Sequence, residues 1–225
     1  MMNNKIMTID FNKTLLLIID VQNDFCPGGA LAVRDGGGVI APLNALAAAF
    51  AAAGGRVAAT QDWHPPGHAS FASVHTGKQP GDIVDLSGMP GQVLWPDHCV
   101  QGEWGAAFHD ELDLKPVNLI IRKGFRKGLD SYSAFFENDR STPTGFEGAI
   151  KQMNIETVIM GGLATDYCVF YSAMDSRRLG FNTIIVSDAV RGVDYPQGSA
   201  EKAAAQMRAE GIGFASSAQL LGEIN

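Results

Sequence analysis

The sequence has few cysteines, no excess of positive charge and no long apolar run, and each shortage excludes a class of protein. Only three cysteines occur among 225 residues, so they cannot all pair, which argues against a disulfide-stabilised scaffold. The formal net charge is -7. Nucleic acid and anionic membranes both require a basic face, so neither is expected as a partner. A small neutral or weakly charged ligand fits better.

The apolar run nearest the start of the chain does not predict a membrane span or a signal peptide. This run, at residues 15–19, is far too short to cross a bilayer and ends at Asp20, where a signal peptide would carry small residues. With the unpaired cysteines, it predicts a cytoplasmic protein. Hydrophobic residues make up 46% of the chain, and no repeat or composition break divides it. We predict a single domain over residues 1–225.

Short apolar runs alternate along the chain with stretches of helical composition. Because strands separated by helices pair in parallel, this alternation predicts an α/β fold with a mainly parallel sheet of about six strands. Each helical stretch ends at a glycine, which is common just beyond a helix C-terminus. The predicted strands cover residues 14–19, 56–60, 117–121, 157–160 and 183–186, with a sixth at 211–216, and the predicted helices cover residues 39–53, 165–179 and 199–209.

Two long segments, at residues 62–102 and 124–142, have the composition of loops. Loops of such length in a compact domain are usually functional or mobile. In an open parallel sheet, ligands bind outside the carboxyl ends of the strands, so polar residues directly after the apolar runs are the candidates for a site. These candidates are Asp20, Asp62 with His64, Lys123 and the turn at residues 161–168.

Cys168 lies in GGLATDYCVF, where a predicted strand turns into a predicted helix. With Thr165 as the N-cap, the cysteine falls in the first helical turn, where orphan N–H groups and the helix dipole stabilise an anion. A thiolate at this place would be nucleophilic. The alternative is a buried structural cysteine, which is the interpretation kept for Cys26 and Cys99.

Asp20 and Lys123 each follow another apolar run. Asp20 ends LLLIID and would lie half desolvated at the edge of the core, a setting that suits a general base. Lys123 follows VNLIIR and could pair with Asp20 across strand ends, helping to orient a thiolate. Each alone has an ordinary explanation, as a capping aspartate or a solvated lysine. Together with Cys168 they predict a nucleophile, a proton carrier and an electrostatic partner.

The segment QDWHPPGH at residues 61–68 predicts a metal site. In extended backbone the side chains of Asp62 and His64 point to the same side, and a carboxylate with an imidazole suits a divalent transition metal. His98, in WPDHC, is the best third ligand from the same long segment, and such a trio leaves coordination positions open. His68 is either a further ligand, a loop histidine or a donor to a ligand.

Two aromatic residues lie near these polar groups in the sequence. Phe25 follows the Asp20 segment and Trp95 precedes His98, so both could flank a flat ring. The alternative is that both belong to the core, as aromatic side chains more often do.

Five motifs occur along the chain in a fixed order. They are IIDVQNDFCPGGAL at residues 18–31, TQDWHPPGHASF at 60–71, WPDHCVQG at 95–102, RKGF at 122–125 and GGLATDYCV at 161–169. The ordered set resembles the nicotinamidase/pyrazinamidase group of the isochorismatase-like cysteine hydrolases, and it is far more specific than any one motif.

The resemblance implies a three-layer α/β/α, Rossmann-like fold and assigns roles to the nucleophile region. Asp20, Lys123 and Cys168 match the catalytic triad of the family. The backbone N–H groups of Ala164 and Cys168 match its oxyanion hole, with a cis peptide bond before Ala164.

The resemblance also implies the metal ligands and the ring-binding residues. Asp62, His64 and His98 match the ligands, while Phe25 and Trp95 match positions that stack on the substrate ring. A divalent metal is implied, with zinc first and iron or manganese as alternatives. Family members differ in how coordination is completed, and here both His68 and Ser70 lie in the relevant region, so further ligands stay open.

The implied activity is hydrolysis of nicotinamide to nicotinate and ammonia, and of pyrazinamide to pyrazinoate, through a thioester on Cys168, as a step in NAD salvage. One alternative is a hydrolase of another small amide or ureido compound on the same triad. Another is a non-catalytic metal- or ligand-binding module. No partner is expected besides the substrate and, in a homo-oligomer, further copies of the chain.

Overall fold

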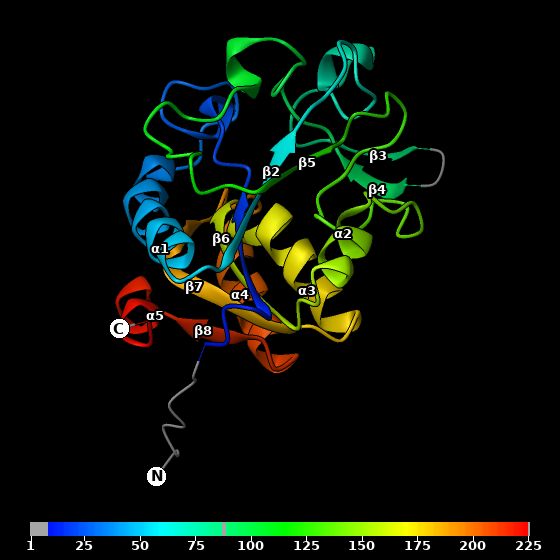
Figure 1. Ribbon diagram of the computed structural model, residues 1–225. Helices are drawn as coiled ribbons and strands as arrows, with labels where there is room; N and C mark the ends of the chain where they lie inside the picture. Colours follow the sequence, from blue (N-terminus) through cyan, green and yellow to red (C-terminus); the bar gives the residue numbers. More distant parts are fainter. Residues whose placement is uncertain (1–8, 87–88, 225) are drawn as a thin grey trace.

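A six-stranded parallel sheet runs through the centre of the molecule (Figure 1). The computed structural model describes residues 9–86 and 89–224. Within them the strand order is β5-β2-β1-β6-β7-β8, and every neighbouring pair is parallel. The predicted sheet is therefore confirmed. Its strands are β1 (Thr14–Ile19), β2 (Arg56–Asp62), β5 (Leu119–Lys123), β6 (Thr157–Leu163), β7 (Asn182–Arg191) and β8 (Gly213–Ala215).

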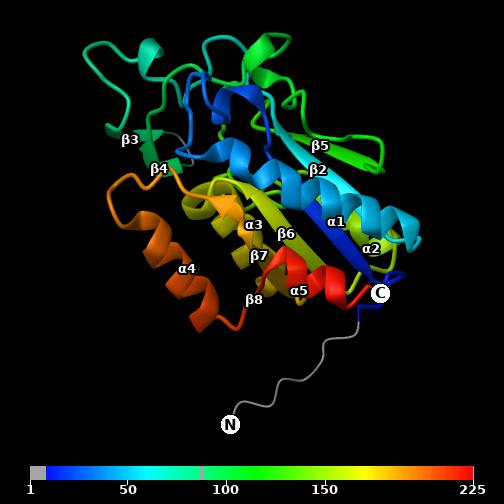
Figure 2. The same ribbon diagram turned by 90° about the vertical axis from the view of Figure 1, so that its left-hand side faces the viewer.

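Helices cover both faces of this sheet and complete three layers (Figure 2). The strand β1, with the sequence TLLLII, is buried along its whole length because both of its faces are covered. Leu16 and Ile18 enter the core on one face, and Leu15, Leu17 and Ile19 enter the core on the other. The first core also holds α1 (Ile40–Ala52) and α5 (Ser217–Gly222); the second holds α2 (Phe146–Gln152), α3 (Phe170–Arg178) and α4 (Ser199–Ala209).

Some elements differ from the sequence prediction. The antiparallel hairpin of β3 (Ile83–Leu86) and β4 (Met89–Val93) lies inside the segment predicted as a loop. Its strands are short and its sequence is broken by glycine and proline, so it lacks a clear period of two. The helices α2 and α5 were also missed, because each spans only about two turns. The predicted helix at residues 165–179 divides into a π-helical turn (Thr165–Val169) and α3.

The loop-rich segments gather at the carboxyl ends of the central strands, at the top of Figure 1. Residues 124–142 contain no helix or strand of the main sheet, as predicted. Among the described residues, no helix is long and apolar enough to cross a membrane.

Candidate active site

The ends of four neighbouring strands bring the candidate residues together. Parallel pairing places Asp62 opposite Lys123 at the ends of β2 and β5, and Ile19 opposite Gly162 at the ends of β1 and β6. Asp20 follows β1 directly. A side chain on Gly162 would collide with the backbone of Ile19, so only glycine allows the two strands to approach this closely.

The ammonium group of Lys123 lies at the centre of the site. Its Nζ is 2.9 Å from Asp20 Oδ2, 2.5 Å from Asp62 Oδ1 and 3.5 Å from Cys168 Sγ. It also donates to the carbonyl oxygen of Ser131, at 3.1 Å. Burial alone would lower the pKa of Lys123, but the carboxylates of Asp20 and Asp62 raise that pKa well above its usual range. The side chain is therefore a fixed positive charge.

The thiol of Cys168 is buried beside this charge. Burial raises its pKa well above the usual range, and the opposing effect of Lys123 is smaller. Burial therefore opposes the stabilisation of a thiolate that the helix terminus predicts, and a neighbouring base is needed to take the proton. Asp20 is the neighbouring carboxylate on the triad side; its Oδ1 accepts a hydrogen bond of 2.6 Å from Thr60 Oγ1.

The turn that carries Cys168 is π-helical rather than α-helical. It runs from Thr165 to Val169 and its N-cap is Ala164, so the prediction of Thr165 as N-cap is wrong. The Leu163–Ala164 peptide bond is cis, as the family resemblance implied. Ala164 and Cys168 both line the same cavity.

Asp62, His64 and His98 form a compact group of metal-ligand type. Each offers a ligand atom, and these atoms lie within 4.8 Å of one another. His64 Nδ1 is 2.9 Å from the carbonyl oxygen of Gly124, and His98 Nδ1 is 2.8 Å from that of Pro96. A proton on each Nδ1 satisfies these carbonyls and leaves each Nε2 lone pair free for a metal, with His64 Nε2 3.8 Å from Asp62 Oδ2.

Burial sets the charge of this group. It lowers the pKa of His64 and of His98 to about 4, so both rings are neutral at pH 7 and able to bind a metal. Burial raises the pKa of Asp62 to about 7, although Lys123 and His98 oppose that shift. Gly124 is required beside this group, since a Cβ there would lie 2.5 Å from the ring of His64.

His68 and Ser70 are buried behind His64. His68 Nδ1 lies 2.8 Å from Ser70 Oγ, and its Nε2 lies 3.0 Å from the carbonyl oxygen of Arg126. The rings of His68 and His64 are 4.4 Å apart. Although His68, His64 and Asp130 also form a group of possible ligands, the contacts of both nitrogens favour a supporting role for His68.

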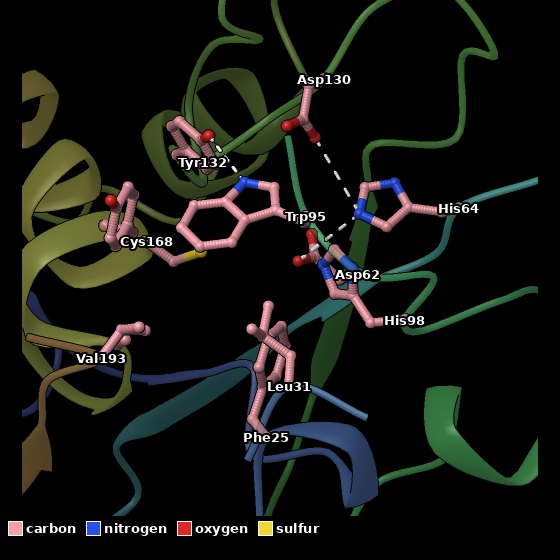
Figure 3. Close-up of a pocket in the computed structure, with 12 residues that line it drawn as sticks. Phe25, Leu31, Asp62, His64, Trp95, His98, Asp130, Tyr132, Cys168 and Val193 are labelled. Carbon is pink, nitrogen blue, oxygen red and sulfur yellow. Dashed lines mark hydrogen bonds and ion pairs between the residues drawn. The ribbon is translucent and has the colours of Figure 1, made fainter. Parts of the chain in front are cut away.

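Asp130 is a site residue that the sequence reasoning missed. It is fully buried, and its Oδ1 lies 3.9 Å from His64 Nε2 (Figure 3). Burial would raise the pKa of Asp130, but the imidazoles of His64 and His68 lower it below its usual value. In the sequence, Asp130 is marked only by its position in the long loop at residues 124–142. Loops have no periodic pattern that would distinguish one carboxylate from another.

The cavity has the shape of a slot between apolar walls. In Figure 3, Trp95 lies on one side of the cavity and Phe25 with Leu31 on the other, while Cys168 and the histidines lie at its two ends. The Trp95 ring is held by a hydrogen bond of 3.0 Å from its Nε1 to Tyr132 Oη. A slot with a nucleophile at one end and ligand atoms at the other fits a small flat ring. The lining residues are Phe25, Leu31, Asp62, His64, Trp95, His98, Asp130, Tyr132, Ala164, Tyr167, Cys168 and Val193.

Comparisons with known proteins agree with this geometry. Residues 14–219 match the model of the Isochorismatase domain family. The chain is 46% identical over 210 residues to a nicotinamidase of Acinetobacter baylyi, covering 93% of this chain and 95% of that protein.

Solved structures extend the likeness to the fold. The chain superposes on the nicotinamidase/pyrazinamidase of Acinetobacter baumannii with a TM-score of 0.88 and 45% identity, covering 93% of this chain and 98% of that one. It also resembles the pyrazinamidase of Pyrococcus horikoshii, solved in complex with zinc, with a TM-score of 0.74 and 30% identity over 91% of this chain and 99% of that one.

Proposed function

The chain belongs to the isochorismatase domain family, and from this premise we propose how its site hydrolyses nicotinamide. Its activity is that of an amidohydrolase that converts nicotinamide to nicotinate and ammonia, as in relatives that are 44–46% identical over most of the chain. Pyrazinamide is the second substrate, since it differs from nicotinamide by one additional ring nitrogen and the related Acinetobacter protein is a nicotinamidase/pyrazinamidase. The observation that supports the mechanism best is that Cys168 and Asp62 line one cavity, while the buried Lys123 Nζ lies 3.5 Å from Cys168 Sγ and 2.5 Å from Asp62 Oδ1.

The residues at one end of the slot fit a divalent metal. Asp62, His64 and His98 supply one oxygen and two neutral imidazoles, a set that leaves open positions for a ligand. Zinc is the metal we propose, since the Pyrococcus relative binds it. When bound, the metal would polarise or position the pyridine nitrogen or a water beside it. His68 and Ser70 would hold His64 from behind rather than bind the metal.

The other end of the slot carries out the covalent chemistry. Asp20 takes the thiol proton while Cys168 Sγ bonds to the carboxamide carbon, and the N–H groups of Ala164 and Cys168 donate to the carbonyl oxygen as it gains charge. Asp20 then gives the proton to the amide nitrogen, the C–N bond breaks, and ammonia leaves a thioester. Lys123 does not attack; it holds Asp20 and balances the charge.

Hydrolysis of the thioester restores the enzyme. Asp20 accepts a proton from a water molecule whose oxygen bonds to the thioester carbon. The C–S bond then breaks, the sulfur of Cys168 takes back a proton, and nicotinate leaves. Trp95 and Phe25 keep the substrate ring in a fixed orientation between them, so that the reacting carbon stays beside the sulfur of Cys168.

Ammonia release from nicotinamide by the purified chain tests this proposal. Cys168→Ala should lower turnover by about 10³-fold or more, because the covalent route is lost. Nicotinate binding, followed by tryptophan fluorescence, should be retained, since the slot and the metal residues are intact. Prior chelation should also abolish turnover. A Cys168→Ala protein that kept most of its ammonia release would show that no thioester forms.

The alternative activities fit less well. A hydrolase of other small amides or ureido compounds would use the same triad, and it becomes the better hypothesis if the metal-loaded chain releases no ammonia from nicotinamide. A non-catalytic module would not need a buried lysine between two carboxylates and a thiol. A cytoplasmic location remains part of the proposal, supported by the free thiols of Cys26, Cys99 and Cys168.

A further inference from the structure

One polar side chain of the β3–β4 hairpin is buried next to residues of the site. Gln92, on β4, is only 4% exposed although it lies in a peripheral two-stranded sheet. None of the steps above uses it. Burying an amide side chain costs free energy unless its donors and acceptor form hydrogen bonds. The partners of Gln92 therefore indicate its role.

Gln92 links the metal end of the slot to its Trp95 wall through its amide group. Its Nε2 donates to Asp130 Oδ2 at 2.8 Å and to the carbonyl oxygen of Val93 at 2.8 Å, and it lies 3.1 Å from Tyr132 Oη. Its Oε1 accepts a hydrogen bond of 3.1 Å from Asn138 Nδ2. Asp130 faces the metal-ligand group through His64, and Tyr132 Oη accepts the hydrogen bond that fixes Trp95 (Figure 3).

We infer that Gln92 is a positioning residue that holds Asp130 at the metal end of the slot and, through Tyr132, the Trp95 wall that stacks on the ring. This inference rests on the proposed function, since it takes Asp62, His64 and His98 as the metal ligands. One amide thereby fixes the distance between the metal-side carboxylate and the aromatic wall. A substrate ring must meet both at once, so a loss of this amide should weaken metal and ring binding together.

The first test measures binding rather than turnover. Gln92→Met keeps the length of the side chain but removes the donor to Asp130. The affinity for Zn²⁺, measured by competition with a chromophoric chelator, should fall about tenfold or more, as is typical when a residue supporting a metal site is lost. The affinity of the zinc-loaded protein for nicotinate, measured by tryptophan fluorescence, should fall as well.

Two further variants separate positioning from general loosening of the hairpin. Tyr132→Phe removes the hydroxyl that Trp95 Nε1 and Gln92 Nε2 both contact but leaves the hydrogen bond from Gln92 to Asp130. Nicotinate affinity should therefore fall, and Zn²⁺ affinity should stay within about twofold of the unmodified protein. Asp85→Ala is the matched control, because Asp85 is exposed and accepts a hydrogen bond from the Gly91 amide within the same hairpin. It should change neither affinity.

The outcomes distinguish this inference from the proposed function. If the unmodified protein binds Zn²⁺ and Gln92→Met binds it equally well, the inference is wrong while the metal site stands. Equal losses in Asp85→Ala and Gln92→Met would also overturn it, since hairpin stability would then explain both. If the unmodified protein takes up no Zn²⁺, the proposed metal site fails and the inference fails with it.

Discussion

Lys123 is the residue on which both halves of the site depend. Its ammonium contacts Asp20 on the nucleophile side and Asp62 on the metal side, and all three side chains are buried. One cation thus compensates two carboxylates in a low-dielectric interior. Without it, two negative charges would face each other there, and such a pair keeps its charge only at a large cost in desolvation.

We predict that Lys123→Met destabilises the fold as well as abolishing turnover. The free energy of unfolding should fall by about 3–5 kcal/mol, because breaking a buried ion pair leaves uncompensated charge. Urea unfolding at pH 7.5 measures this. Lys151→Met is the control, since Lys151 pairs with Glu147 on an exposed helical face and its loss should cost about 0.5 kcal/mol or less. Equal stability of the two variants would contradict the central role of Lys123.

His64 is close to both other members of the proposed metal-ligand group. We predict that His64→Ala loses bound metal and binds nicotinate more weakly, because its ring lies 3.8 Å from Asp62 Oδ2 and 4.9 Å from the ring of His98. Metal content by elemental analysis tests this. The control is His75→Ala, because the ring of His75 lies 2.8 Å from the Ala69 carbonyl oxygen and, among the described residues, belongs to no group of possible metal ligands. Unchanged metal content in the His64 variant would refute the ligand assignment.

Among the structural elements, the positions of the strands could be predicted from the sequence, although β2 and β5 each extend two residues beyond the predicted ends at 60 and 121, and the loops could not. Asp20 and Lys123 each lie at the end of a largely apolar run. The run marks the strand, and its end marks the position where a site residue is expected. Asp130 and Gln92 have no such mark, because their positions depend on long-range packing of loop and hairpin. The environment of Cys168 also cannot be predicted from the sequence, since burial is the largest cause of its raised pKa and the sequence does not show that burial.

The loop at residues 124–142 is tied together by a buried carboxyl group. Glu137 is 0% exposed, and Arg126 donates to its Oε1, which joins the two halves of the loop that carries Asp130. Among the residues that the structure describes, the buried Oε2 atom of Glu137 has no hydrogen-bond partner. Burial raises the pKa of Glu137 to about 7, although Arg126 opposes the shift.

This carboxyl group should make stability fall as the pH rises. Between about pH 4.5 and pH 7 the folded protein holds a proton on Glu137 that the unfolded chain has lost, so stability is highest below this window and declines through it. Glu137→Gln cannot ionise. We predict that its free energy of unfolding, from urea titrations at pH 5 and pH 8, declines by about 1–2 kcal/mol less than that of the unmodified protein. An equal decline in both proteins would contradict this.

The molecule as a whole has two cores that share one sheet. Alternate residues of β1 belong to opposite cores, and β6 divides in the same way, with Ile159 on one side and Val158 and Met160 on the other. Neither core can lose its strands without exposing the other. The site is joined to the same strands, because Asp62 and Lys123 are the paired last residues of β2 and β5.

We therefore predict that the sheet and the active-site end unfold together as one cooperative unit, as expected for a single domain over residues 1–225. The chain has three tryptophans, and Trp63, Trp95 and Trp104 all lie in segments after β2 and before β5. Their fluorescence reports the site end, whereas far-UV circular dichroism reports the helices and strands. Urea transitions followed by the two signals should coincide. A fluorescence transition at lower urea would mean that the loops around the slot open before the sheet, and that the ion pairs of Lys123 do not couple them.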